Sequence, residues 1–170
     1  TTFCTGGSVT LTSSAGSSYL WSPGNQTSQS ISVSSAGTYN VRVTDANGCT
    51  KVSSNTTVTV NALPTATITP GSTTTFCQGG SVTLLASSGS SYLWSPGNQT
   101  SQSISVSSGG TYNVRVTNSN GCSKSATTTV TVKPLPNANI SMSGSATLCA
   151  GQSVNLNAST GTGYAYVWYK

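Results

Sequence analysis

The chain has almost no ionisable side chains. Only 4% of its 170 residues are charged, Asp45 is the single acid, and histidine and glutamate are absent. Acid–base catalysis needs a titratable group near the working pH, so neither paired carboxylates nor a Ser-His-Asp arrangement can form. A Ser–Lys pair is the one catalytic pair that the composition permits, and solvated Ser and Lys on strand surfaces explain the same residues. We therefore expect no enzyme activity, no catalytic residue and no cofactor.

Long apolar runs and clusters of basic residues are also missing. No stretch of about 20 apolar residues is present, so the sequence predicts no membrane span. The formal net charge is +5, but the basic residues are scattered, whereas nucleic-acid-binding proteins gather them on one face. They are Arg42, Lys51, Arg115, Lys124, Lys133 and Lys170. Nucleic acid is therefore not an expected partner.

What the chain does contain is a repeated sequence. Residues 3–11 (FCTGGSVTL) recur as residues 76–84 (FCQGGSVTL), an offset of 73. Residues 17–35 recur unchanged as residues 90–108. Such self-similarity is the signature of a tandem array of one structural unit.

The copies divide the chain into three expected repeats. They cover residues 1–61 (lacking the first strand), residues 65–133 (complete) and residues 137–170 (the N-terminal half only). The connections between them, at residues 62–64 and 134–136, contain proline, which ends strands and stiffens the crossing. We expect semi-rigid stacking of the repeats and a much longer parent protein.

Apolar residues alternate with polar ones in short segments, and no segment shows helical periodicity. This period of two, interrupted by turn residues, is typical of strands, and closely spaced turns indicate a β-sandwich. The predicted strands are residues 8–12, 19–22, 30–33, 38–44, 56–60, 66–69 and 139–142.

Aromatic residues refine the fold prediction. One Trp follows each Val-x-Leu segment, and a Gly-Thr-Tyr sequence opens a long Val-x-Val strand, as in the tyrosine corner of immunoglobulin domains. The fold class is therefore predicted as all-β, with tandem immunoglobulin-like β-sandwich repeats of about 73 residues. The expected core aromatics are Trp21, Tyr39, Trp94, Tyr112 and Trp168.

Five cysteines are distributed over the copies. We expect the pairs Cys4–Cys49 and Cys77–Cys122, one inside each repeat, with the partner of Cys149 outside these 170 residues. The alternative, zinc binding, is not favoured, because the sequence has no Cys-x-x-Cys motif and no histidine. Persistent disulfides form in oxidising compartments, so we expect an extracellular protein.

Two further groups of residues have alternative interpretations. Asp45-Ala46-Asn47-Gly48 faintly resembles a calcium loop, but Asn-Gly is also a common turn sequence, and we expect a turn and no metal site. The aromatic residues flanking each Trp position could stack on sugars, and Tyr19 and Tyr92 are the candidate surface contacts.

The succession of motifs resembles a known group of proteins. Phe-Cys-x-Gly-Gly-Ser-Val-Thr-Leu, Tyr-Leu-Trp-Ser-Pro-Gly, Gly-Thr-Tyr-Asn-Val-Arg-Val-Thr and Asn-Gly-Cys are similar to the Ig-like and PKD-like repeats of giant surface adhesins in gliding Bacteroidota. Those include the SprB-type gliding adhesins, exported by type IX secretion. The resemblance covers nearly the whole chain. It implies a cell-surface stalk or filament used in adhesion or gliding motility.

Three functions are therefore considered. The first is a structural stalk, whose partners are neighbouring repeats or filament subunits. In the second, the repeats themselves bind glycans or abiotic surfaces, with weak sites summed by avidity. In the third, they are a spacer in a large secreted enzyme. Repeats could be joined by strand exchange between chains, although we expect continuous covalent repeats.

Overall fold

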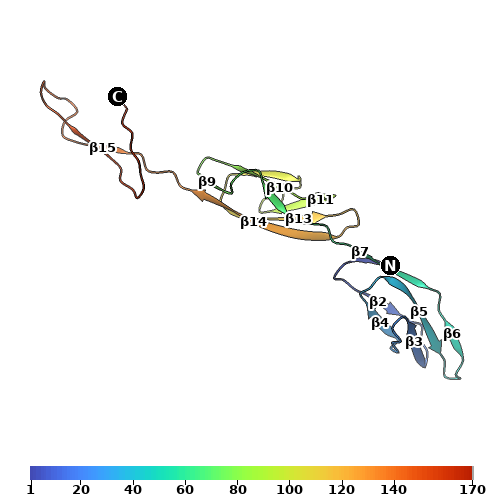
Figure 1. The fold of residues 1–170 in the computed structure, drawn as a ribbon. Helices are drawn as coiled ribbons and strands as arrows, with labels where there is room; N and C mark the ends of the chain where they lie inside the picture. The colour runs from blue at the N-terminus through green and yellow to red at the C-terminus, as the bar shows by residue number, and fades with distance from the viewer. Residues whose placement is uncertain (170) are drawn as a thin grey trace.

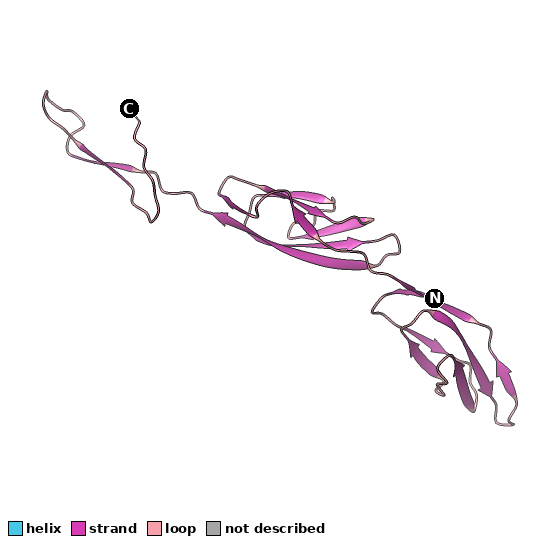
Figure 2. Ribbon diagram, in the orientation of Figure 1, coloured by secondary structure: helices cyan, strands magenta, loops and turns pink. Residues whose placement is uncertain are grey.

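The computed structural model describes residues 1–169 and forms a row of β-sheet units (Figure 1). Every regular element in this range is a strand (Figure 2). Among these residues no helix is long and apolar enough to cross a membrane.

The first unit is a two-sheet sandwich. One sheet has the order β1-β7-β5-β3, with β6 also paired to β5, and the other pairs β2 with β4. The strands are β1 (Thr2–Cys4), β2 (Val9–Thr12), β3 (Ser18–Ser22), β4 (Ser30–Val33), β5 (Gly37–Thr44), β6 (Thr50–Val52) and β7 (Thr56–Asn61).

The second unit has the same arrangement, except that it adds β8 and has the single strand β14 where the first unit has β6 and β7. Its sheets have the orders β12-β10-β8 and β11-β13-β14-β9. The strands are β8 (Ile68–Pro70), β9 (Thr75–Cys77), β10 (Val82–Ala86), β11 (Ser91–Ser95), β12 (Ser103–Val106), β13 (Gly110–Thr117) and β14 (Ser123–Lys133).

Each sandwich closes over its own apolar core, because alternate residues of facing strands point inward. In the second unit, Leu84, Trp94 and Val114 have no exposed surface. The indole Nε1 of Trp94 donates to the Ser101 carbonyl at 2.9 Å, so its one polar atom is satisfied inside the core. Trp21 does the same with Ser28 at 2.9 Å.

The two predicted tyrosine corners are present. The Tyr39 hydroxyl donates to the Ser35 carbonyl at 3.1 Å, and the Tyr112 hydroxyl donates to that of Ser108 at 2.9 Å. Both rings are 7% exposed. Each hydrogen bond anchors the chain entering the long strand, as in immunoglobulin domains.

A bulge distinguishes the first unit from the second. Strand β14 is continuous over 11 residues, whereas its counterpart is split into β6 and β7. Ser53 lies in the break between β6 and β7, opposite Val41 of β5. Val41 N–H donates to the Ser53 hydroxyl at 3.1 Å, and Ser53 N–H donates to the Val41 carbonyl at 2.9 Å. One extra residue in this stretch disrupts the ladder in the way β-bulges do.

The C-terminal segment, residues 134–169, forms a hairpin instead of a sandwich. Strands β15 (Ile140–Ser143) and β16 (Asn155–Ala158) pair only with each other in the described chain. Trp168, predicted to lie in a core, is 54% exposed. For the described residues that placement was wrong, because none of their other strands packs over this hairpin to enclose the indole.

The alternation of inward and outward residues on β10 gives a matched test of the core. Leu84→Ala removes a fully buried side chain, and we expect it to lower the free energy of unfolding of the second sandwich by about 2–5 kcal/mol. Leu85 is adjacent and 45% exposed, so Leu85→Ala should change it by about 0.5 kcal/mol or less. Native-state hydrogen exchange of β12 and β13 amides would measure both. Equal losses would contradict the assignment of the faces.

Candidate functional site: the joint between the sandwiches

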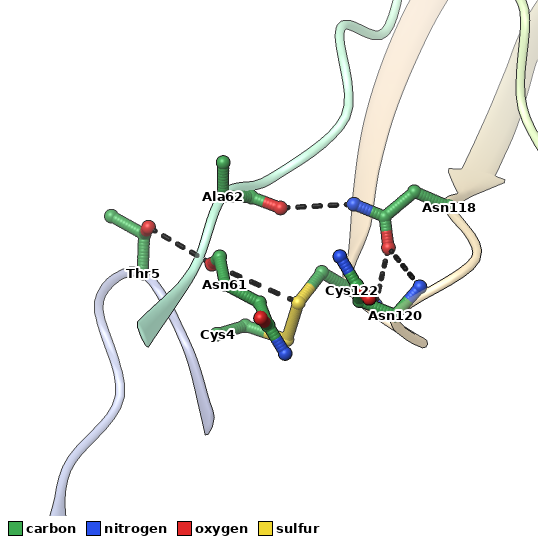
Figure 3. The surroundings of a disulfide bond; sticks show 7 residues. All are labelled: Cys4, Thr5, Asn61, Ala62, Asn118, Asn120 and Cys122. Atoms are coloured by element: carbon green, nitrogen blue, oxygen red, sulfur yellow. Dashed lines mark hydrogen bonds between the residues drawn. A yellow bond between two sulfur atoms is a disulfide. The ribbon is translucent and has the colours of Figure 1, made fainter. Parts of the chain in front are cut away.

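A disulfide joins the two sandwiches to each other. Cys4 Sγ is bonded to Cys122 Sγ, with the Cα atoms 5.6 Å apart, across a sequence separation of 118 residues (Figure 3). Cys4 ends β1, and Cys122 precedes β14. The bond therefore gives the two units a covalent connection in addition to the backbone.

The expected pairs Cys4–Cys49 and Cys77–Cys122 were wrong. Strand β1 pairs parallel with β7, so that Cys4 lies beside Asn61, the last residue before the connection to the second unit. The turn that carries Cys49 follows β5, which runs antiparallel to β7, and it lies at the opposite end of the sandwich. Within residues 1–169, the cysteines outside the disulfide are Cys49, Cys77 and Cys149, all exposed free thiols.

An asparagine reinforces the joint. The Asn118 Nδ2 donates to the Ala62 carbonyl in the interdomain connection at 2.9 Å. Its Oδ1 accepts from the N–H groups of Asn120 at 3.1 Å and Cys122 at 3.0 Å, which holds the turn in shape. One amide thus organises its own turn and binds the preceding unit (Figure 3).

The sulfur of Cys122 contacts the same connection. It lies 3.9 Å from the Asn61 carbonyl oxygen, and because a disulfide sulfur carries no proton, this is a packing contact and not a hydrogen bond. The Cys122 residue is completely buried. The joint therefore shields the Cys122 half of the bond from water, while Cys4 is half-buried.

Asp45 is the counterpart of Asn118 in the first unit. Its Oδ1 accepts from the N–H of Asn47 at 2.8 Å and from that of Cys49 at 2.9 Å. The carboxylate thus acts as the turn residue that we expected. No group of three or more potential metal ligands occurs among residues 1–169.

Tyr19 and Tyr92, the candidate surface contacts, hold their own loops. The Tyr19 hydroxyl accepts from Gly16 N–H at 2.9 Å and donates to the Gly16 carbonyl at 3.0 Å; Tyr92 makes the same pair with Gly89 at 2.8 and 3.1 Å. Both rings are half-buried against the cores. The hydroxyls are therefore occupied within the loop, and the ring edges are the part left for an external contact.

Sequence reasoning missed the interdomain disulfide because the parallel strands β1 and β9 were not predicted. Three residues before a Gly-Gly turn are too few to show a periodic pattern. The one signal in the sequence was Asn118 in place of Asp45, which supplies a donor where the joint needs one.

Comparison with solved structures gives only distant likenesses. The amphioxus IgVJ-C2 molecule is 14% identical, with 77% of this chain and 99% of that chain covered and a TM-score of 0.34. The Clostridium thermocellum CbhA fibronectin(III)-like modules are 12% identical, with 78% and 89% covered and a TM-score of 0.40.

A third likeness is to a 1.5-MDa bacterial ice-binding adhesin, at 19% identity, with 84% of this chain and 64% of that chain covered and a TM-score of 0.35. No family model and no curated protein sequence matches. The likenesses concern the fold class, all-β and immunoglobulin-like, and we base no functional argument on them.

Removing the disulfide tests whether it fixes the joint. We expect Cys4→Ser to leave both sandwiches folded, because repeat stability is largely local, but to let them move independently. Residual dipolar couplings measured by NMR should fit one alignment tensor in the parent chain and two different tensors in the variant. Cys49→Ser, which removes a free thiol, is the control and should keep one tensor. A single tensor in Cys4→Ser would show that the connection is rigid without the bond.

Proposed function

We propose that this chain is a stiff segment of an extracellular stalk or filament. The observation that supports it most directly is the Cys4–Cys122 bond between successive sandwiches. Domains joined by one short linker are expected to move relative to each other. A second covalent link at the joint opposes hinge bending, which is what a stalk requires and an isolated binding module does not.

The surface chemistry supports the same function. Six basic residues and one acid are spread over 170 residues, so the surface has little charge to screen or to repel neighbouring segments. Such a segment would keep its shape over a wide range of salt concentration. This suits a protein exposed to a variable medium.

The location and biological role follow from chemistry and from the motifs. A disulfide that fixes a domain joint supports a working place outside the reducing cytosol. The motif resemblance to the repeats of gliding adhesins supports a cell-surface protein used in adhesion or gliding and exported by type IX secretion. In this proposal the segment carries no catalytic site and presents an adhesive part located elsewhere.

Immunogold electron microscopy of the producing cells tests the stalk. An antibody against residues 65–133 should decorate thin threads that extend from the cell, with gold along their length. Cys4→Ser cells should keep the label while the threads become visibly more curved, because the joints lose their second link. Gold confined to soluble complexes in the medium would contradict the stalk and favour the spacer in a secreted enzyme.

A second candidate function is glycan binding. Tyr164, Tyr166 and Trp168 line a cavity of about 940 Å³, and the Tyr164 and Tyr166 rings meet edge to face with their centroids 6.3 Å apart. Exposed aromatic faces offer large rigid contact area at low entropic cost. These side chains are more accessible than Tyr19 and Tyr92.

A glycan array on the full chain tests this candidate. Binding should fall at least about tenfold in Trp168→Ala, equivalent to about 1.4 kcal/mol, and persist in the matched variants Tyr19→Ala and Tyr92→Ala. A silent array would remove glycan binding. Loss only in the Tyr19 and Tyr92 variants would move the site to the loops of the sandwiches.

A further inference from the structure

The Cys4–Cys122 bond closes a covalent loop that contains most of both sandwiches. The bonded cysteines are 118 residues apart in the sequence, and all the strands from β2 to β13 lie between them. A pull applied between the residues before Cys4 and those after Cys122 is therefore carried by the bond itself. The residues enclosed in the loop are not stretched by that pull.

Beyond the bond, the strand that receives the pull is β14. It begins at Ser123, directly after Cys122, and runs for 11 residues to Lys133, where the chain leaves the second sandwich. Figure 1 shows β14 lying along the row of units, from the joint toward the C-terminal segment. The bond therefore attaches the first unit to the strand that leads directly out of the second.

This route has almost no slack. A strand rises about 3.3–3.4 Å per residue, whereas a fully extended chain reaches at most about 3.6 Å per residue. Over the 11 residues of β14 the difference is about 2–3 Å in total. Strand β1 is extended as well. Tension along this route is thus taken up by the covalent chain without a large movement.

The hydrogen bonds of β14 are not loaded by such tension. β14 pairs antiparallel with β13, from Thr117 opposite Ser123 to Gly110 opposite Val130. The bonds of an antiparallel ladder lie perpendicular to the strands. Because the pull enters and leaves at the two ends of β14 itself, it straightens β14 without sliding it past β13. The core of the second sandwich packs against the loaded strand but carries none of the load.

Without the bond, the pull would take a different route through the second sandwich. It would enter through Ala62 and the three-residue edge strand β8, which pairs with β10, and it would leave through β14. Strands β8 and β14 belong to different sheets, so the packed core would lie between the two points of attachment. A three-residue edge strand has few hydrogen bonds to resist detachment.

The pairing of β1 with β7 connects the first sandwich to the bond. The two strands are parallel, with Cys4 beside Asn61, and Thr5 N–H donates to the Asn61 carbonyl at 2.8 Å. On the other side of the joint, the Asn118 side chain donates to the Ala62 carbonyl at 2.9 Å (Figure 3). The end of the first sandwich is thus held beside the bond, so that load on β7 passes to Cys4.

We propose that this segment transmits tension along a load path made of β1, the Cys4–Cys122 bond and β14, and that this path keeps the second sandwich folded under load. The inference rests on the proposed stalk function and adds a second mechanical role to it. The bond that opposes bending at the joint also prevents extension. A stalk between a cell and a surface is under such tension whenever the two are pulled apart.

Single-molecule force spectroscopy on the full chain, held at its two termini, tests the load path. In oxidising buffer, the parent chain should release no length from residues 5–121. Cys4→Ser should lengthen the stretched chain by about 390–420 Å, because the 118-residue separation of the cysteines extends at about 3.3–3.6 Å per residue. Adding a reductant to the parent chain should give the same gain.

Two controls accompany these measurements. Cys49→Ser removes a thiol outside the bond and should extend like the parent chain. Residues 134–170 lie outside the closed loop and add the same length to every record. Peptide mapping of the oxidised chain should find Cys4 linked to Cys122, and a different pairing would overturn the proposal.

A core substitution tests whether the second sandwich is free of load. Leu84 is completely buried and Leu85 is 45% exposed. With Cys4→Ser present, Leu84→Ala should lower the force at which the second sandwich unfolds, because it leaves a cavity in the core, and Leu85→Ala should not. With the bond intact, neither substitution should change the force record.

The contrary outcomes are distinct. Equal extension of the oxidised parent chain and Cys4→Ser would overturn the load path. A change of the force record in Leu84→Ala with the bond intact would do the same, because it would place the core between the points of attachment. Either result together with gold-labelled threads on cells would reject this inference and leave the stalk function standing.

Discussion

The bond between Cys4 and Cys122 determines how the two sandwiches are joined, and it depends on the parallel pairing of β1 with β7. A short strand placed beside the last strand of its own sandwich carries its cysteine to the end of that unit. The Asn-Gly turn of the next unit arrives at the same place. The joint therefore takes one cysteine from the preceding unit and one from the following unit.

The surrounding groups act in support of this bond. Asn118 spans the joint with one side chain, because its amide both accepts from its own turn and donates to Ala62. The Cys122 side of the bond is completely buried. Away from the joint, each core closes independently, so that the covalent link constrains orientation more than it stabilises either sandwich.

The same geometry explains why the three units look so different. Within residues 1–169, β8 lies on the edge of β10 in the second unit, and the corresponding edge of β2 in the first unit has no strand beside it. Among the described residues, the first unit keeps a buried Ser13 hydroxyl without a hydrogen-bond partner, and the C-terminal hairpin exposes Ile140 and Trp168.

The sequence by itself determined the fold class, the strands with clear alternation and the aromatic residues of the two closed cores. These follow from local patterns. Side chains alternate between the two faces of a strand, and this two-residue period places Trp21, Tyr39 and their counterparts in the second repeat on the inward face. The short strands β1 and β9, the pairing of the cysteines and the exposure of Trp168 were decided by tertiary structure. Three-residue strands have no readable period, and spacing along the chain does not reveal which end of a sandwich a cysteine occupies. Parallel pairing places Cys4 at the opposite end of the sandwich from Cys49, and Trp168 is exposed because no second sheet of the described residues covers its hairpin. Both outcomes depend on which segments meet in space.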